Sequence, residues 1–206
     1  MEIIKKATTP ITWEEVKELV EKGHHKSFFE AGDIIPAELK DGQNVRFVVA
    51  EIFDDSIAFV TEDCLKDRHC MNDSWTNKGG WRDCAMRKYL NTEIYELLPD
   101  DLKAVIAERE ILQQFESHES VCYDKLWLLS RTEVGYDYET DKGDVHFSLF
   151  KDERSRVKQV EGETWWYWLR SPSAASSTAF CFVASTAPPA TPTPPPPRMA
   201  WRSASW

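Results

Sequence analysis

Apolar positions recur at helical spacing near the start of the chain, at Trp13, Val16, Leu19 and Val20. Thr12 precedes them, and Glu15 follows Thr12 at the spacing of a capping box, in which the two side chains satisfy free backbone N–H groups. Gly23 ends the pattern, as glycine commonly does after a helix. The pattern predicts a helix over 12–22.

Two further helices are predicted in the middle of the chain. Residues 81–98 are rich in arginine, methionine, leucine and alanine, and Pro99 stops the segment. Residues 100–107 form a shorter segment that is entered through the same proline. Apolar residues of the longer segment recur at helical spacing and are expected to lie in the core: Met86, Tyr89, Leu90, Ile94 and Leu97.

Short runs of β-branched and aromatic residues predict strands. These runs cover 44–50 and 57–61, which an acidic turn separates, and then 125–130, 165–169 and 179–183. With the helices, they indicate an α+β fold in which two helices pack on small antiparallel sheets and loops make up much of the chain.

The composition changes near the C-terminal end. From Ser173 onward alanine, serine, threonine and proline fill most positions, and residues 188–197 read PPATPTPPPP. Such a proline run cannot form a helix interior or a central strand. We therefore expect one domain over 1–185, followed by a Pro/Ala/Thr-rich tail over 186–206.

The charge of the chain limits its partners. The formal net charge of −10 argues against nucleic acid, which needs a basic surface, and against an anionic membrane surface. No apolar run reaches the length of about 18 residues that spans a bilayer, so no membrane insertion is expected. The N-terminal sequence MEIIKKATTPITWEEV lacks the apolar core of a signal peptide. We expect cytoplasmic synthesis, so that if the protein works outside a cell, something else, such as a phage particle or a cell-surface carrier, must take it there.

The cysteines do not predict a disulfide framework, because their number is odd and their spacing irregular: Cys64, Cys70, Cys84, Cys122 and Cys181. A zinc site made of Cys64, His69, Cys70 and Cys84 is disfavoured, since C-x5-C is not a zinc-finger spacing. The acidic clusters at 54–55 and 137–144 do not fit the calcium-loop pattern and are expected to be solvated. No metal and no cofactor is therefore expected.

Four segments follow one another in a characteristic order. They are 72–81 (NDSWTNKGGW) with Arg87, Leu90 and Asn91 after it, then Leu97, Leu98 and Pro99 with Leu102, then 124–134 (DKLWLLSRTEV), and last 166–172 (WYWLRSP) followed by AFCFVAS at 179–185. This ordered set resembles a large bacterial and phage family with a C-type-lectin-like fold. The resemblance covers 12–185.

Many members of that family are variable proteins of diversity-generating retroelements, in which a reverse transcriptase errs at template adenines. The resemblance implies that variation begins after a WLRSP-like segment and that a rigid scaffold displays the varied side chains. It implies a framework at Trp168, Leu169, Arg170, Ser171 and Pro172. It implies variable, ligand-binding positions at Ala174, Ala175, Ser176, Ser177, Thr178, Cys181, Ala184, Thr186 and Pro188. The implied function is display of a binding surface for a protein or surface ligand in host or surface recognition, without enzyme activity.

The framework segment also predicts how its own side chains are used. The run at 165–168 contains three tryptophans and a tyrosine, and alternate packing on both faces of a central strand is favoured over ligand contact for Trp166 and Trp168. Arg170 is expected to be a buried structural residue that bonds loop carbonyls.

The tail supports a hypothesis from the genetic code. Residues 186–197 are all threonine, alanine or proline, which with serine are the residues whose four-codon boxes have C as the middle base. A run of NNC codons read one base late gives this pattern, so we hypothesise a frameshift near 184–186. The alternative is a Pro/Thr-rich linker.

Two other functions remain open at this point. One is a structural phage-particle or surface protein without a variable ligand. The other is an enzyme like the formylglycine-generating oxidases of the same broad fold, which use paired cysteines and metal. Beyond Cys122, Cys181 is the only cysteine in the C-terminal half, so the sequence offers no evident pair.

Overall fold

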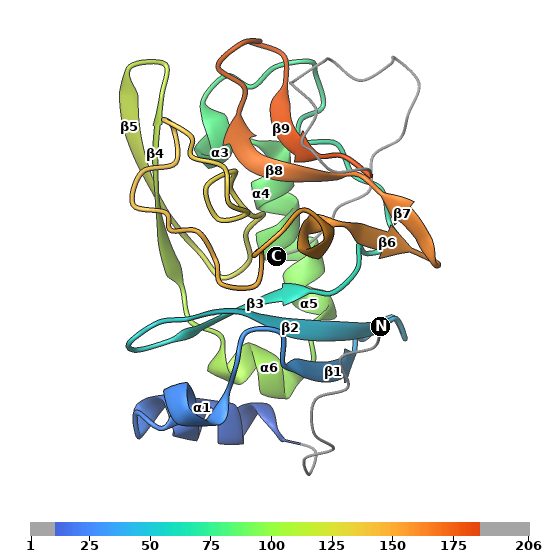
Figure 1. The fold of residues 1–206 in the computed structure, drawn as a ribbon. Helices are drawn as coiled ribbons and strands as arrows, with labels where there is room; N and C mark the ends of the chain where they lie inside the picture. The colour runs from blue at the N-terminus through green and yellow to red at the C-terminus, as the bar shows by residue number, and fades with distance from the viewer. Residues whose placement is uncertain (1–10, 186–206) are drawn as a thin grey trace.

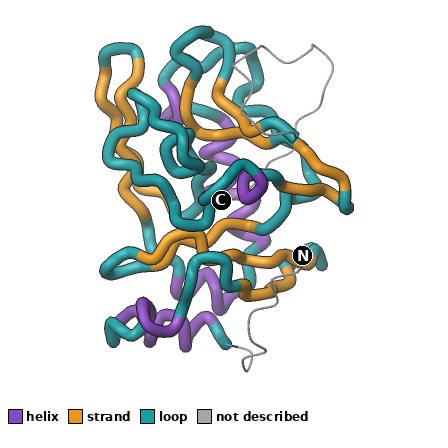
Figure 2. The backbone as a smooth tube through the Cα atoms, viewed as in Figure 1, coloured by secondary structure: helices purple, strands orange, loops and turns teal. Residues whose placement is uncertain are grey.

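The computed structural model describes residues 11–185, and the rest of the chain is drawn in grey (Figure 1). Short helices and small antiparallel sheets make an α+β fold, in agreement with the hydrophobic pattern. Long loops join many of these elements (Figure 2). The predicted tail over 186–206, with Thr186, Pro188 and the hypothesised frameshift, lies outside the described residues.

A three-stranded antiparallel sheet crosses the lower half of the molecule in Figure 1. Its order is β1 (Ile34–Glu38), β2 (Asn44–Ile52) and β3 (Ile57–Thr61), so the two strands predicted at 44–50 and 57–61 are confirmed. The β2–β3 register shifts between Val49 and Glu51. The later strands of the chain lie on one side of this sheet (Figure 1).

Helix α1 (Trp13–Glu21) packs beneath the sheet where the sequence predicts a helix over 12–22. The capping box is formed, because the Glu15 backbone N–H donates to Thr12 Oγ1 at 3.2 Å and the Thr12 N–H donates to Glu15 Oε2 at 2.8 Å. The Trp13 ring meets the rings of Phe47 and Phe59 edge-on at 5.5 and 5.3 Å. These contacts attach the helix to the sheet, and a short α2 (His25–Phe28) follows.

The prediction of one continuous helix over 81–98 is wrong. The segment contains α3 (Gly80–Asp83), α4 (Ala85–Tyr89), a π-helical turn (Leu90–Ile94) and α5 (Tyr95–Leu97). Between α3 and α4 the chain is extended at Cys84, whose Sγ accepts the Arg87 N–H at 3.4 Å. Cys84 therefore begins a new helix, and apolar spacing does not reveal such a side-chain cap. Helix α6 (Asp100–Val105) ends before the predicted residue 107.

A long hairpin follows, and the sequence pattern did not predict it. β4 (Arg109–Phe115) pairs with β5 (His118–Asp124) along its whole length. Buried Trp81 ties α3 to both strands, since its backbone N–H donates to Gln113 Oε1 at 2.7 Å and its Nε1 donates to Asp124 Oδ2 at 2.8 Å. Gly80 has φ +60°, and a Cβ there would lie 2.1 Å from the same Gln113 oxygen, so this approach requires glycine.

The segment predicted as a strand at 125–130 is buried but forms no ladder. Leu126, Leu128 and Leu129 are all buried. The Arg170 backbone N–H donates to the Leu129 carbonyl at 2.8 Å, which attaches the segment to a neighbouring strand at one point. The continuous apolar run at 126–129 is the feature that predicts a strand here, and the structure buries much of that run without forming a ladder.

The last sheets are the pair β6 (Lys158–Val160) and β7 (Glu163–Trp165), after a short 3-10 helix (Arg154–Arg156), and the pair β8 (Tyr167–Pro172) and β9 (Phe180–Val183). The aromatic run alternates between two hydrophobic clusters. Trp166 and Trp168 belong to one cluster, and Tyr167 and Leu169 belong to the other. The predicted packing on two faces is confirmed, but the strand is not central, because β8 pairs with β9 alone among the described strands and Trp166 lies between β7 and β8.

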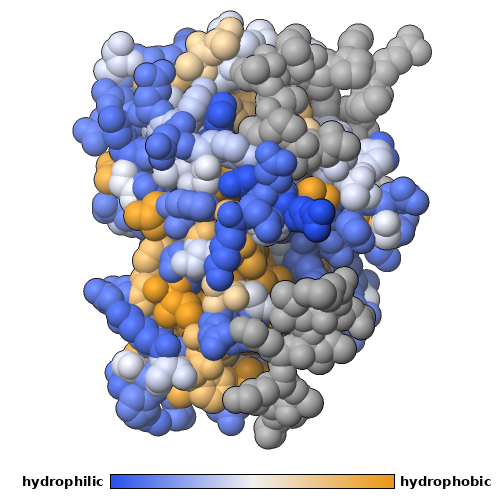
Figure 3. All heavy atoms as spheres, viewed as in Figure 1, coloured by the Kyte–Doolittle hydropathy of each residue, from blue (hydrophilic) through white to orange (hydrophobic). Residues whose placement is uncertain are grey.

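Within residues 11–185, no helix combines the length and apolar character needed to cross a membrane. On the face shown in Figure 3, apolar residues gather around the three-stranded sheet, and hydrophilic residues cover the β4–β5 hairpin.

Candidate binding site

The β8–β9 hairpin carries the segment that the sequence singles out. All six residues of β8 are buried, including the framework residues Trp168, Leu169, Arg170, Ser171 and Pro172. Trp168 pairs with Phe182 and Pro172 with Phe180, and the register shifts between these pairs. The strands are joined by residues 173–179, which we call the display loop.

Asn77 holds the display loop from beneath. Its Nδ2 lies 3.1, 2.7 and 2.9 Å from the carbonyl oxygens of Ser173, Ser176 and Ala179. Its backbone N–H donates to the Ser177 carbonyl at 2.9 Å. Asn77 is fully buried, and each of these bonds reaches the main chain of the loop rather than a side chain.

Further bonds close the base of the loop. The Ser173 N–H donates to the Ala179 carbonyl at 2.9 Å, and the Ala174 N–H donates to the Tyr138 hydroxyl at 2.8 Å. The Ser171 hydroxyl donates to Asp141 at 2.8 Å and accepts the Arg131 N–H at 2.8 Å. The loop is therefore fixed through its backbone and through framework residue Ser171.

Most predicted variable positions of the loop point to solvent. Ala174, Ala175, Ser177 and Thr178 are exposed, and Ser176 is half-buried, with its hydroxyl 3.0 Å from that of Thr178. Within the described chain, the side-chain hydrogen bonds of these positions stay inside the loop: the pair of hydroxyls, and the Thr178 N–H, which donates to Ser176 Oγ at 3.3 Å.

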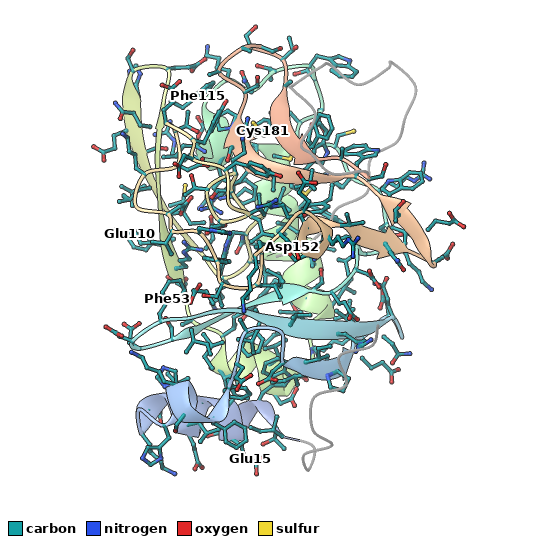
Figure 4. All side chains as sticks on the ribbon, in the orientation of Figure 1. Glu15, Phe53, Glu110, Phe115, Asp152 and Cys181 are labelled. Carbon is teal, nitrogen blue, oxygen red and sulfur yellow. The ribbon has the colours of Figure 1, made fainter. Side chains whose placement is uncertain are left out.

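Cys181 does not belong to this exposed set, although the resemblance implies a variable position there. It is 4% exposed, lies in a hydrophobic cluster, and burial raises the pKa of its thiol. Figure 4 shows it on β9, below the loop. Cys181 is buried because side chains alternate along β9 and this one faces the hydrophobic cluster. Ala184, which lies beyond β9, is half-buried.

Framework residue Arg170 is buried, as expected, but carboxylates are its main partners. Its Nη1 donates to the Leu128 carbonyl at 2.8 Å, in agreement with the prediction of a bond to a loop carbonyl. The same guanidinium also binds Glu133 at 2.6 and 3.1 Å and Asp144 at 2.5 Å. Arg109 binds the same two carboxylates from β4.

The expectation of a solvated acidic loop at 137–144 is wrong for two of its carboxylates. Asp141 binds Ser171, and the Asp144 side chain is 4% exposed within the arginine cluster. Burial raises the pKa of Asp144 to about 6 and also raises the pKa of Asp141, despite the nearby Arg170. Burial would raise the pKa of Glu133 too, but the guanidiniums of Arg170 and Arg109 hold it below its ordinary value.

A hollow of about 570 Å³ lies beside the display loop. Three segments that are distant in sequence border it: the turn of the β4–β5 hairpin, the stretch 139–142 and the loop itself (Figure 1). The hairpin turn has positive φ at Glu116 (51°) and Ser117 (64°), where glycine or asparagine is usual. The loop side chains and this hollow together form the candidate binding site.

Residues of the zinc site that the sequence disfavours make other contacts in the described chain. The His69 ring stacks on Tyr89 at 3.9 Å, and its Nδ1 lies 2.8 Å from the Cys70 carbonyl. Cys84 is buried and caps a helix. In the part of the chain from 11 to 185, no three His, Cys, Asp or Glu side chains are grouped so as to hold a metal ion.

The described residues thus form an α+β fold in which the β8–β9 hairpin exposes one loop, and hydrogen bonds hold the main chain of that loop. A family model described as "Domain of unknown function (DUF6273)" matches residues 51–188, about two thirds of the chain, and the chain belongs to this family. The match includes the whole display loop, Asn77 and the arginine cluster. A search of curated proteins found no match, and a search of solved structures found none either.

Proposed function

We propose that the chain is a ligand-binding display protein with a C-type-lectin-like fold, in which residues 174–178 carry the side chains that select the ligand. The observation that supports this most directly is the contact between buried Asn77 and the carbonyls of the display loop. Every amino acid supplies a carbonyl, so the loop keeps its shape when its side chains change. Recognition loops on rigid scaffolds are built in this way.

The proposal includes the source of the variation. The WLRSP segment is buried framework, Ser173 after it is also buried, and the exposed positions begin at Ala174. A mutagenic reverse transcriptase that alters codons after this segment would thus change surface residues first. Host or surface recognition is the use that such a varied surface serves.

The partner is a protein or another surface. Trp75 is 54% exposed and lies two residues before Asn77, so the backbone places it close to the loop. Tryptophan is enriched among residues that dominate binding energy. We assign Trp75 the role of a constant aromatic contact beside the varied residues.

The encoding DNA and its neighbourhood test the origin of the variation. We expect a nearby reverse transcriptase gene and an imperfect repeat of the segment coding from Trp168 onward, with mismatches only at template adenines. The same repeat reveals whether a base was lost near residue 185. A locus without the gene and without the repeat would remove retroelement diversification from the proposal.

A display library tests binding itself. Codons 174, 175, 177 and 178 are randomised together in the full chain, and a matched library randomises 161–164 at the β6–β7 turn. We expect folded binders to a chosen protein target from the first library at much higher frequency than from the second. Equal frequencies, or loss of folding in most loop variants, would contradict the proposal.

A further inference from the structure

Two carboxylates line the hollow beside the display loop. Glu116 comes from the β4–β5 turn and Glu139 from the stretch before β6. Both residues are exposed, and neither carboxylate forms an ion pair with another of residues 11–185. Glu116 Oε2 accepts only a long bond from the Gly79 N–H, at 3.4 Å. The hollow therefore presents two carboxylates that no ion pair within the described chain neutralises.

Two residues that line the same hollow also have buried side-chain oxygens without partners. Ser173 is 2% exposed and Asn77 is fully buried, and both residues line the hollow. Neither Ser173 Oγ nor Asn77 Oδ1 has a hydrogen-bond partner within the described part of the chain. An unsatisfied buried acceptor costs stability, so a ligand group that reached either oxygen and donated a hydrogen bond to it would remove this cost.

We propose that this hollow receives a basic side chain, lysine or arginine, from the protein that the display loop binds. The inference rests on the proposed display function and names the chemistry of the partner. An ammonium or guanidinium carries several N–H donors and a positive charge, which match the hydrogen-bond acceptors and the two carboxylates. The hollow, of about 570 Å³, has room for such a side chain. The net charge of −10 favours approach by a basic partner.

Lys142 is the one basic residue among those that line the hollow. It is exposed and forms no ion pair with another described residue. Its charge competes with an incoming cation, so its removal has the opposite effect to removal of the glutamates. This opposition gives the proposal a signed test.

The test uses small probes and NMR of the full chain. Acetyl-lysine methylamide, with a free ε-ammonium, and acetyl-arginine methylamide are titrated, and acetyl-norleucine methylamide serves as the neutral counterpart. We expect the two basic probes to shift the backbone amides of Ser117, Lys142 and Ser176. Glu116→Gln with Glu139→Gln weakens this binding roughly three- to ten-fold, as for two exposed ion pairs. Lys142→Ala strengthens it.

The matched control is Glu161→Gln with Glu163→Gln, which removes the same charge at another hairpin turn; Glu161 also has positive φ, at 53°. This control is expected to leave probe binding unchanged. Equal shifts with the norleucine probe, shifts spread over the acidic surface, or equal weakening by both double variants would overturn the inference. None of these results affects the loop library, whose outcome decides the display function separately.

Discussion

The Arg170 guanidinium grips the Glu133 carboxylate with two hydrogen bonds of 2.6 and 3.1 Å, and both side chains are almost completely buried. Arg170 belongs to the WLRSP framework, and Glu133 belongs to the segment that passes beneath it. The pair therefore joins the strand that carries the display loop to the interior of the fold.

Arg170→Met is expected to lower the free energy of unfolding by about 3–5 kcal/mol, because it leaves buried Glu133 and Asp144 without their main positive partner. Urea unfolding measures the change. Arg46→Met is the control, since Arg46 pairs with Glu62 on the surface, where such pairs contribute about 0–1 kcal/mol. Similar losses in the two variants would show that the buried cluster contributes no more to the free energy of unfolding than a surface ion pair does.

Asn77→Ala is expected to lower the free energy of unfolding by about 1–3 kcal/mol, because loop carbonyls lose their donor. Hydrogen exchange at the Ser173 and Ala174 amides should also become faster. Asn72→Ala removes a comparable side chain, whose bonds go to Thr76 and Ala85 instead. It should destabilise the chain without accelerating exchange at the loop, and loop exchange that is unaltered by Asn77→Ala would refute the role of this residue.

Tyrosine substitutions should have different effects on stability in the exposed loop and in the strand that follows it. Ala175→Tyr is expected to change the free energy of unfolding by no more than about 0.5 kcal/mol, as at other exposed positions. Cys181→Tyr should cost about 1–3 kcal/mol or more, because it overfills a packed cluster. Thermal unfolding of the two variants provides the comparison, and an equal cost would mean that the loop is part of the packed core.

The pKa of Asp144, raised to about 6, gives a stability term with a defined sign. Between roughly pH 4 and 6 the folded chain holds a proton that the unfolded chain has released, so this group lowers stability as pH rises through that window. Relative to Asp144→Asn, the natural chain should lose about 2–3 kcal/mol from pH 4 to pH 7. Urea unfolding at each pH measures this difference, and a constant difference would exclude the raised pKa.

Lys158 gives a term of the opposite sign at alkaline pH. Burial lowers its pKa to about 8, and its Nζ donates to the carbonyls of Thr61 and Glu62. Between roughly pH 8 and 10 the unfolded chain retains a proton that the folded chain has released, so stability rises with pH. The natural chain should gain about 3 kcal/mol relative to Lys158→Met over this interval. If the free energies of unfolding of the two proteins change in parallel from pH 8 to 10, the pKa of Lys158 is not lowered.

Local signals in the sequence predicted the parts of the fold that depend on local physics. The capping box at Thr12 and Glu15 marks α1, and alternation along the aromatic run places Trp166 and Trp168 in one cluster and Tyr167 in the other. Each of these features is encoded within a few neighbouring residues. The exposed loop after Pro172 is expected on other grounds, since the family resemblance implies it.

Other features depend on residues far apart in sequence. Asn77 meets the display loop across about a hundred residues, and nothing near it in sequence marks that contact. The β4–β5 hairpin turns at Glu116 and Ser117 rather than at an Asn-Gly pair, so the usual turn signal is missing. The sequence predicts that Asp141 and Asp144 are solvated, because their contacts with Ser171 and Arg170 are made only in the folded chain.

The spacing of the Asn77 contacts has a consequence for relatives of this protein. The carbonyls it reaches belong to residues 173, 176 and 179, which recur at a constant interval of three. Replacement of a side chain leaves this interval intact, whereas insertion or deletion of one residue moves at least one carbonyl out of reach. Relatives that retain the asparagine should therefore differ freely in loop composition while keeping the loop at one fixed length.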